Sequence, residues 1–142
     1  MYHLFLDDQR DPENAYIYPV KKNKEGIIID GMTLEEASNI PNSEWVIVRT
    51  YTEFVNYIRD YGVPSVISFD HDLDIEHIMY YYAHTQDTGI IEYGNFKVKT
   101  GYHCAQFLVE HCQHNHLKLP KYFIHSANRY GTVNIKKVLE TL

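Results

Sequence analysis

Short apolar runs alternate along this chain with segments in which apolar side chains recur every three or four residues. Four of the runs have the length and the β-branched or aromatic bias of buried strands. These expected strands cover residues 3–8, 44–50, 65–72 and 121–126. The last three are each followed by a helical pattern, over residues 52–61, 100–114 and 132–142. Thr52 is the expected N-cap of the first of these helices.

A shorter helix is expected from Thr33, because "TLEE" supplies a capping box formed by Thr33 and Glu36. Strands that alternate with helices indicate a mostly parallel sheet of about four strands. We therefore expect one doubly wound α/β domain over residues 1–142. Two segments interrupt this pattern: residues 9–31, expected to form a small hairpin, and residues 75–99, a long Tyr-rich loop. Loops of that length are commonly functional lids or poorly ordered.

The composition is that of a globular protein, with 44% hydrophobic and 23% charged residues. No apolar run reaches the roughly 18 residues that a membrane span needs. The N-terminus turns acidic at Asp7 and lacks the features of a signal peptide, so we expect a cytoplasmic protein without a membrane partner. Cys104 and Cys112 lie on one expected helix, roughly 12 Å apart along its axis, which is too far for a disulfide. Both are expected to be buried thiols.

The formal net charge of -6 comes without a basic patch, which argues against a duplex DNA partner. A small anionic ligand would need a local cation, a metal ion or a helix N-terminus.

Acidic and polar residues gather where the expected strands end. The first strand ends in Asp7 and Asp8, the third in Asp70, His71 and Asp72, and the fourth in His125, Ser126 and Asn128. Ligands of open parallel sheets bind beyond the carboxyl ends of the strands. If the first and third strands are neighbours, four or five carboxylates share one small space. Strand alternation would then point Asp70 and Asp72 to one side and His71 to the other.

Carboxylates so close together either raise one another's pKa or bind a hard cation. An all-oxygen cluster suits Mg²⁺, with Mn²⁺ as the alternative, and Asp7, Asp8 and Asp70 are the expected ligands. Asp11 and Asp74 are better explained as turn or cap residues.

Several other residues would suit phosphate chemistry. Ser126 can donate to a phosphate oxygen, whereas Asn128 is by itself more typical of a helix cap. Thr100 and Gly101 begin a helix, where backbone amides can bind phosphate or serve only for capping. His125 and His71 are candidate general acids or bases, although a histidine in an apolar strand is more often a core residue.

Four motifs together resemble a known family. "LFLDDQRDP", "ISFDHDLD", "KTGYHCAQFL" and "IHSANRYGTVNI" occur in this order over nearly the whole chain. They resemble the cyclic-phosphate processing receiver domains, a divergent group of response-regulator receivers found in bacteria and phages, often as stand-alone proteins. The lysine that receivers place after a fifth strand has no counterpart here. Two positions also depart from the family: His103 replaces an expected acidic residue, and "RYG" with Arg129 replaces "PVG".

The resemblance implies a receiver-like (flavodoxin-like) fold and an acidic metal site reworked toward cyclic-phosphate or phosphoester chemistry. The leading hypothesis is a metal-dependent phosphoesterase that acts on a small cyclic or terminal phosphate, on a nucleotide or an RNA end. His71, His125 and Asp72 are its candidate catalytic residues, and Thr100, Gly101, Ser126 and Asn128 its candidate phosphate ligands. Three alternatives remain: a non-catalytic binder that sequesters a nucleotide signal, a phospho-accepting receiver, and an inactive scaffold.

Overall fold

The computed structural model describes the backbone of residues 1–142 and the side chains of residues 1–17, 23–27 and 31–142. The strands are β1 (His3–Leu6), β2 (Tyr16–Lys22), β3 (Ile28–Thr33), β4 (Trp45–Val48), β5 (Val66–Phe69) and β6 (Lys121–Ile124). The α-helices are α1 (Leu34–Ser38), α2 (Tyr51–Tyr61), α3 (Ile75–Tyr80), α4 (Gln86–Thr88), α5 (Gly101–His114) and α6 (Arg129–Leu139). No helix among these described residues has both the length and the apolar character needed to cross a membrane.

Four strands form one parallel sheet in the order β4-β1-β5-β6. The chain moves from β1 outward to β4, and then back across β1 to β5 and β6. The direction of winding therefore reverses between β1 and β5, and this reversal is the switch point at which open α/β sheets bind ligands. The expected α/β fold with a receiver-like, flavodoxin-like sheet is confirmed.

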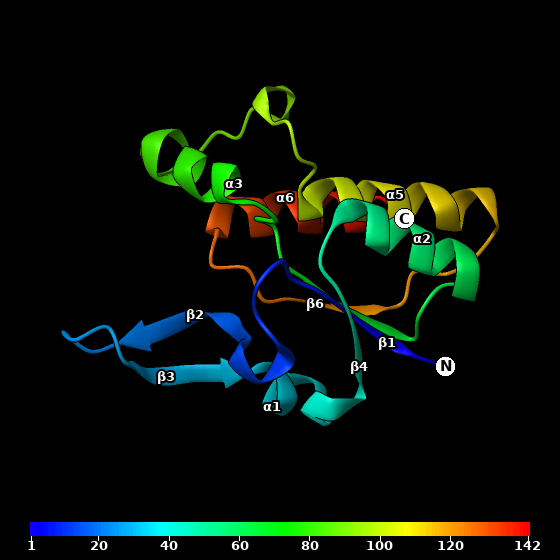
Figure 1. The fold of residues 1–142 in the computed structure, drawn as a ribbon, viewed down its shortest axis with the longest axis horizontal. Helices are drawn as coiled ribbons and strands as arrows, with labels where there is room; N and C mark the ends of the chain where they lie inside the picture. The colour runs from blue at the N-terminus through cyan, green and yellow to red at the C-terminus, as the bar shows by residue number, and fades with distance from the viewer.

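Both faces of the sheet are covered, as Figure 1 shows. Leu4 and Leu6 of β1 pack with α2, α5 and α6, whereas Phe5 points to the opposite face and packs with Leu34 of α1 and Trp45. This alternation follows from the two-residue period of a strand. It explains why each of the three β1 residues is fully buried.

The hairpin expected within residues 9–31 is present and extends to Thr33. Strands β2 and β3 pair antiparallel and form a separate two-stranded sheet. Figure 1 shows this hairpin beside α1, on the side of the main sheet opposite α5 and α6.

Residues 75–99 differ from the expected open loop. The segment contains α3 and α4, a π-helical turn at Tyr81–Thr85 between them and a 3-10 turn at Tyr93–Asn95. Asp74 caps α3 by accepting a hydrogen bond from the Glu76 amide, so its expected role as a cap is correct.

Several predicted boundaries shift. The cap of α2 is Thr50 rather than Thr52, and α6 begins three residues early because Asn128 caps it. Strand β5 ends at Phe69, so Asp70–Asp72 lie beyond the strand and do not follow its alternation. The capping box of Thr33 and Glu36 is present, and both cysteines are free and buried, as expected.

Candidate functional site

The register of the sheet places three polar residues in a row at the switch point. Leu6 pairs with Phe69, and Phe69 pairs with Ile124, so the residue after each strand lies beside its neighbour's. The backbone ladder continues one step further: the Asp70 amide donates to the Leu6 carbonyl (3.0 Å), and the His125 amide donates to that of Phe69 (2.9 Å). Asp7, Asp70 and His125 therefore lie side by side, each directly after the end of its strand.

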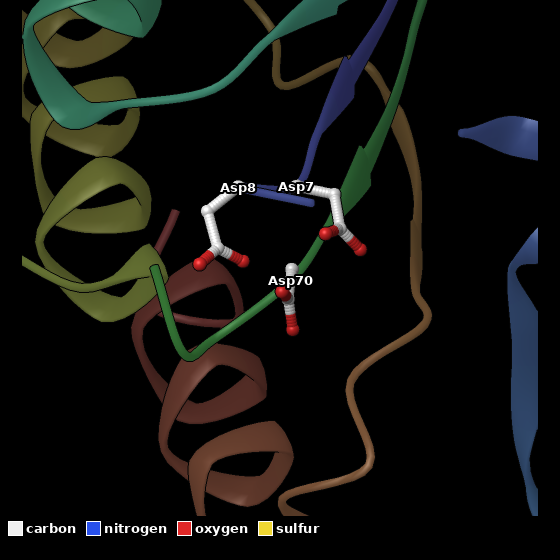
Figure 2. Close-up of side chains that lie close together, drawn as sticks. All are labelled: Asp7, Asp8 and Asp70. Atoms are coloured by element: carbon white, nitrogen blue, oxygen red, sulfur yellow. The ribbon is translucent and has the colours of Figure 1, made fainter. Parts of the chain in front are cut away.

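Asp7, Asp8 and Asp70 form a cluster of carboxylates. One carboxylate oxygen from each lies within 4.8 Å of those of the other two, and Figure 2 shows the side chains directed toward a common space. They line a cavity of about 190 Å³ that we call the acidic pocket. Its lining residues are Asp7, Asp8, Gln9, Arg10, Asp70, Asp72, Ile78, Ser126, Ala127 and Asn128. The three predicted metal ligands thus lie together.

Asp7 is buried but well supplied with donors. Its carboxylate accepts hydrogen bonds from the backbone amides of Gln9 (3.0 Å) and Arg10 (2.8 Å), from the Arg10 guanidinium (2.9 Å) and from His125 Nε2 (3.1 Å). Burial alone would raise the pKa of Asp7, but the His125 hydrogen bond, the backbone donors and the Arg10 charge together lower it to about 2. Asp7 is therefore the permanently charged member of the cluster.

The pKa values of the other two carboxylates, Asp8 and Asp70, shift upward instead. Burial, followed by the negative charge of Asp7, raises the pKa of Asp8 to about 6. The same two causes raise the pKa of Asp70 well above its ordinary value, against the opposing charge of Arg10. Negative charge therefore outweighs the single positive charge of Arg10 at the cluster, and the excess disfavours ionisation of Asp8 and Asp70.

Arg10 is a member of the site that the sequence reasoning missed. Its guanidinium pairs with Asp7 (2.9 Å), lies 3.5 Å from Asp70 and donates to the His125 carbonyl (3.2 Å). The signal was available, because Arg10 stands two residues after Asp8 in the same loop. Arg10 brings a positive charge to the pocket, suited to a bound anion.

His125 lies behind Asp7 and does not line the acidic pocket. Its ring is fully buried, stacks on Phe5 with the centroids 4.6 Å apart, and has both nitrogens in use. Nδ1 lies 2.7 Å from the Ser68 hydroxyl and Nε2 lies 3.1 Å from Asp7. Burial lowers the pKa of His125 despite the Asp7 contact, so the neutral ring donates from Nε2 and accepts from Ser68. These contacts hold the His125 ring between Ser68 and the Asp7 carboxylate.

His71 and Asp72 face each other, instead of lying on opposite sides as strand alternation would require. His71 Nδ1 is 2.6 Å from Asp72 Oδ1, and His71 Nε2 is 2.9 Å from the Tyr93 hydroxyl. Asn134 donates to the same hydroxyl at 2.9 Å. Tyr93 thus joins the 75–99 segment to His71. The His71 ring is buried, and Asp72 is the one of the pair that lines the acidic pocket.

Ser126 and Asn128 both line the acidic pocket. The Ser126 oxygen accepts from the Asn128 amide (3.1 Å), which leaves the hydroxyl hydrogen to donate elsewhere. Asn128 caps α6 through its carbonyl oxygen, which accepts from the Gly131 amide (2.9 Å), and its side-chain amide donates to Asp72 (3.2 Å). The cap that the sequence favoured for Asn128 is present, together with a contact to Asp72.

Thr100 and Gly101 have a structural role. The Gly101 amide donates to the His71 carbonyl (2.8 Å), the Thr100 amide to His103 Nδ1 (2.9 Å) and the Tyr102 amide to the Thr100 hydroxyl (3.1 Å). These amides have partners within the protein, and neither residue lines the acidic pocket, so Thr100 and Gly101 lie apart from the predicted phosphate ligands Ser126 and Asn128. His103 completes the capping box that an acidic residue would otherwise complete.

Three comparisons with known proteins were made, and one of them identifies a family. A search of curated proteins and a search of solved structures return none. The family model for the cyclic-phosphate processing receiver domain matches residues 2–141. Together with the parallel sheet and the position of the acidic pocket at its switch point, this match over nearly the whole length shows that the chain belongs to the cyclic-phosphate processing receiver domain family.

Proposed function

We propose that the protein is a divalent-metal-dependent phosphoesterase that acts on a small cyclic or terminal phosphate, carried by a nucleotide or an RNA end. The observation that carries this proposal is the convergence of Asp7, Asp8 and Asp70 within 4.8 Å at the switch point of the sheet. Carboxylate oxygens are the ligands that Mg²⁺ and Mn²⁺ take in proteins. Asp7, Asp8 and Asp70 would hold the ion, which would neutralise and polarise the phosphoryl group.

The remaining lining residues supply contacts that a phosphate needs. Ser126 presents a hydroxyl hydrogen to a phosphate oxygen, and the Arg10 guanidinium offers a positive charge beside the carboxylates. Asp72 is held by His71 and Asn128 through one oxygen. Its second oxygen is the candidate to accept a proton from an attacking water.

Turnover of a panel of 2′,3′-cyclic nucleotides, cyclic oligonucleotides and RNA with terminal phosphates, in Mg²⁺ or Mn²⁺, tests the proposal. We expect hydrolysis by the wild type and a loss of about 100-fold or more in Asp70→Asn, because a buried ligand of the metal is removed. Asp74→Asn is the matched control, since it also removes one aspartate charge but lies at the cap of α3, where Asn serves equally well. Absence of turnover on the whole panel, or equal turnover by wild type and Asp70→Asn, contradicts the proposal.

A second candidate function is binding without turnover, in which the protein sequesters a nucleotide signal. The position of both histidines favours it, because His71 and His125 are buried and neither lines the acidic pocket. Mass spectrometry of the ligand after incubation separates the two functions. Tight, Asp70-dependent binding with the ligand recovered intact supports sequestration, whereas a cleaved ligand supports the phosphoesterase.

A further inference from the structure

A second cavity lies beside Tyr93, whose hydroxyl group contacts His71. It measures about 470 Å³, which is within the range of small-molecule sites. It is lined by Ile91 and Tyr93 of the 75–99 segment, Tyr102 of α5, and Asn134, Lys137 and Val138 of α6, among others. We call it the tyrosine pocket. It shares no lining residue with the acidic pocket.

Two aromatic rings form one wall of the tyrosine pocket. Tyr93 and Tyr102 stack on each other, with their centroids 4.1 Å apart and their planes 10° from parallel. Tyr93 is further fixed through its hydroxyl group, which accepts a hydrogen bond from the Asn134 side-chain amide and shares a second one with His71 Nε2. Rigid tyrosines are effective platforms for planar ligands, because base–aromatic stacking then costs little conformational entropy.

The other walls combine apolar and polar groups. Ile91 and Val138 provide apolar surface, whereas Asn134 provides an amide whose carbonyl oxygen can still accept a hydrogen bond. Lys137 is exposed, and no acidic side chain among the described residues pairs with it. The pocket thus offers stacking, directional hydrogen bonding and one positive charge. A ligand that matches all three is planar, carries hydrogen-bonding edges and ends in an anion.

We propose that the tyrosine pocket binds a nucleoside monophosphate, with its base against the outer surface of the Tyr93–Tyr102 stack and its phosphate on Lys137. This site goes beyond the proposed function, because it uses none of the carboxylates of the acidic pocket and needs no metal. It also gives the 75–99 segment a purpose: that segment brings Ile91 and Tyr93 to helices α5 and α6.

Calorimetric titration of 5′-AMP into the full-length protein in EDTA tests the site, with adenosine and inorganic phosphate as partial ligands. We expect saturable binding of one AMP, weaker binding of adenosine and the weakest binding of phosphate. Tyr102→Leu weakens both AMP and adenosine by about fivefold or more. Lys137→Gln weakens AMP by about threefold and leaves adenosine unchanged.

Three control variants make each outcome decisive. Lys136→Gln changes the neighbouring exposed lysine, which does not line the tyrosine pocket, and keeps wild-type affinity for AMP. Tyr102→Phe retains the ring and keeps the affinity, which separates stacking from misfolding. Asp70→Asn abolishes the proposed metal chemistry and leaves AMP binding intact. No saturable AMP binding by the wild type, equal weakening by Lys136→Gln and Lys137→Gln, or loss of AMP binding in Asp70→Asn overturns the proposal.

Discussion

Gly101 shows how one absent side chain shapes the acidic pocket. A Cβ atom at this position would lie 1.8 Å from the Asp70 carbonyl oxygen, and the Gly101 amide donates to the carbonyl of His71. Helix α5 can therefore approach the β5 loop only with glycine here. Gly131 plays the same part for the His71 ring, where a Cβ would come within 2.3 Å.

Gly101→Ala is expected to lower the free energy of unfolding by about 3 kcal/mol, because the atom it meets belongs to the backbone and cannot rotate away. Gly94→Ala is the matched control: a Cβ there meets nothing within 4 Å, so the change should stay within about 0.5 kcal/mol. Urea denaturation followed by the fluorescence of Trp45 measures both. Equal denaturation midpoints for the two variants would show that α5 can shift away from Asp70.

Helix α5 begins with an unusual capping box. His103 Nδ1 accepts the Thr100 amide hydrogen, so the ring must remain unprotonated at that nitrogen. Burial, with a smaller contribution from the charge of Lys99, lowers the pKa of His103 to about 4. The unfolded chain takes up a proton near pH 6.5 and the folded chain only near pH 4. Stability from this group is therefore complete above pH 6.5 and is lost as the pH falls through this window.

His103→Gln should remove that pH dependence, because glutamine accepts the same hydrogen bond and does not titrate. At pH 7.5 the variant and the wild type should agree within about 0.5 kcal/mol. At pH 5 the variant should be more stable by about 1 kcal/mol, a value reduced because His103 is only partly buried. Urea denaturation at the two pH values checks this. A stability difference that is the same at pH 5 and pH 7.5 would exclude His103 as the titrating cap.

Repulsion between the clustered carboxylates lowers the stability of the folded protein at the switch point of the sheet. The formal net charge is -6, and the sheet adds to this a concentration of carboxylates between β1 and β5. The folded pKa of Asp8, raised to about 6 by burial and by Asp7, means that folding favours its neutral form. The stability that the neutral form provides is present below pH 4 and is lost as the pH rises toward 6.

Asp8→Asn should therefore stabilise the metal-free protein at pH 8 by about 1 kcal/mol, well below the full value of the pKa shift because Asp8 is half exposed. The gain should disappear at pH 4, where wild-type Asp8 is protonated in the folded state. Denaturation in EDTA at both pH values measures it. A gain at pH 4 as large as at pH 8 would show that the charge of Asp8 is not the cause.

Added MgCl₂ should make the wild type more stable than Asp8→Asn at pH 8, the reverse of the order expected in EDTA. An ion that binds only the folded wild type stabilises it by about 2.7 kcal/mol at a hundred times its dissociation constant, whereas Asp8→Asn should gain less. Asp74→Asn, which loses a charge outside the acidic pocket, should gain as much as the wild type. Equal stabilisation of all three proteins would point to general ionic strength instead of a site.

Local patterns in the sequence predicted most of the helices and strands and the carboxylates of the acidic pocket. Short apolar runs indicate the buried strands. Thr33, Thr100 and Asn128 mark the starts of the helices that they cap, because a cap depends on neighbours within three residues. Asp7, Asp8 and Asp70 were expected together because strand ends in a parallel sheet share one edge. Boundaries were less exact, since each strand of the main sheet ends two or three residues before its predicted end.

Contacts between residues far apart in the chain came from the three-dimensional packing alone. Tyr93 shares hydrogen bonds with His71, 22 residues away in the sequence, and with Asn134, 41 residues away. His125 contacts Asp7, which is 118 residues away in the sequence. No local spacing encodes such pairs, because they depend on strand order, on the path of the 75–99 segment and on which ring is buried. The sequence therefore placed carboxylates and histidines at one edge, and the fold assigned the carboxylates to the pocket and the histidines to the layer behind it.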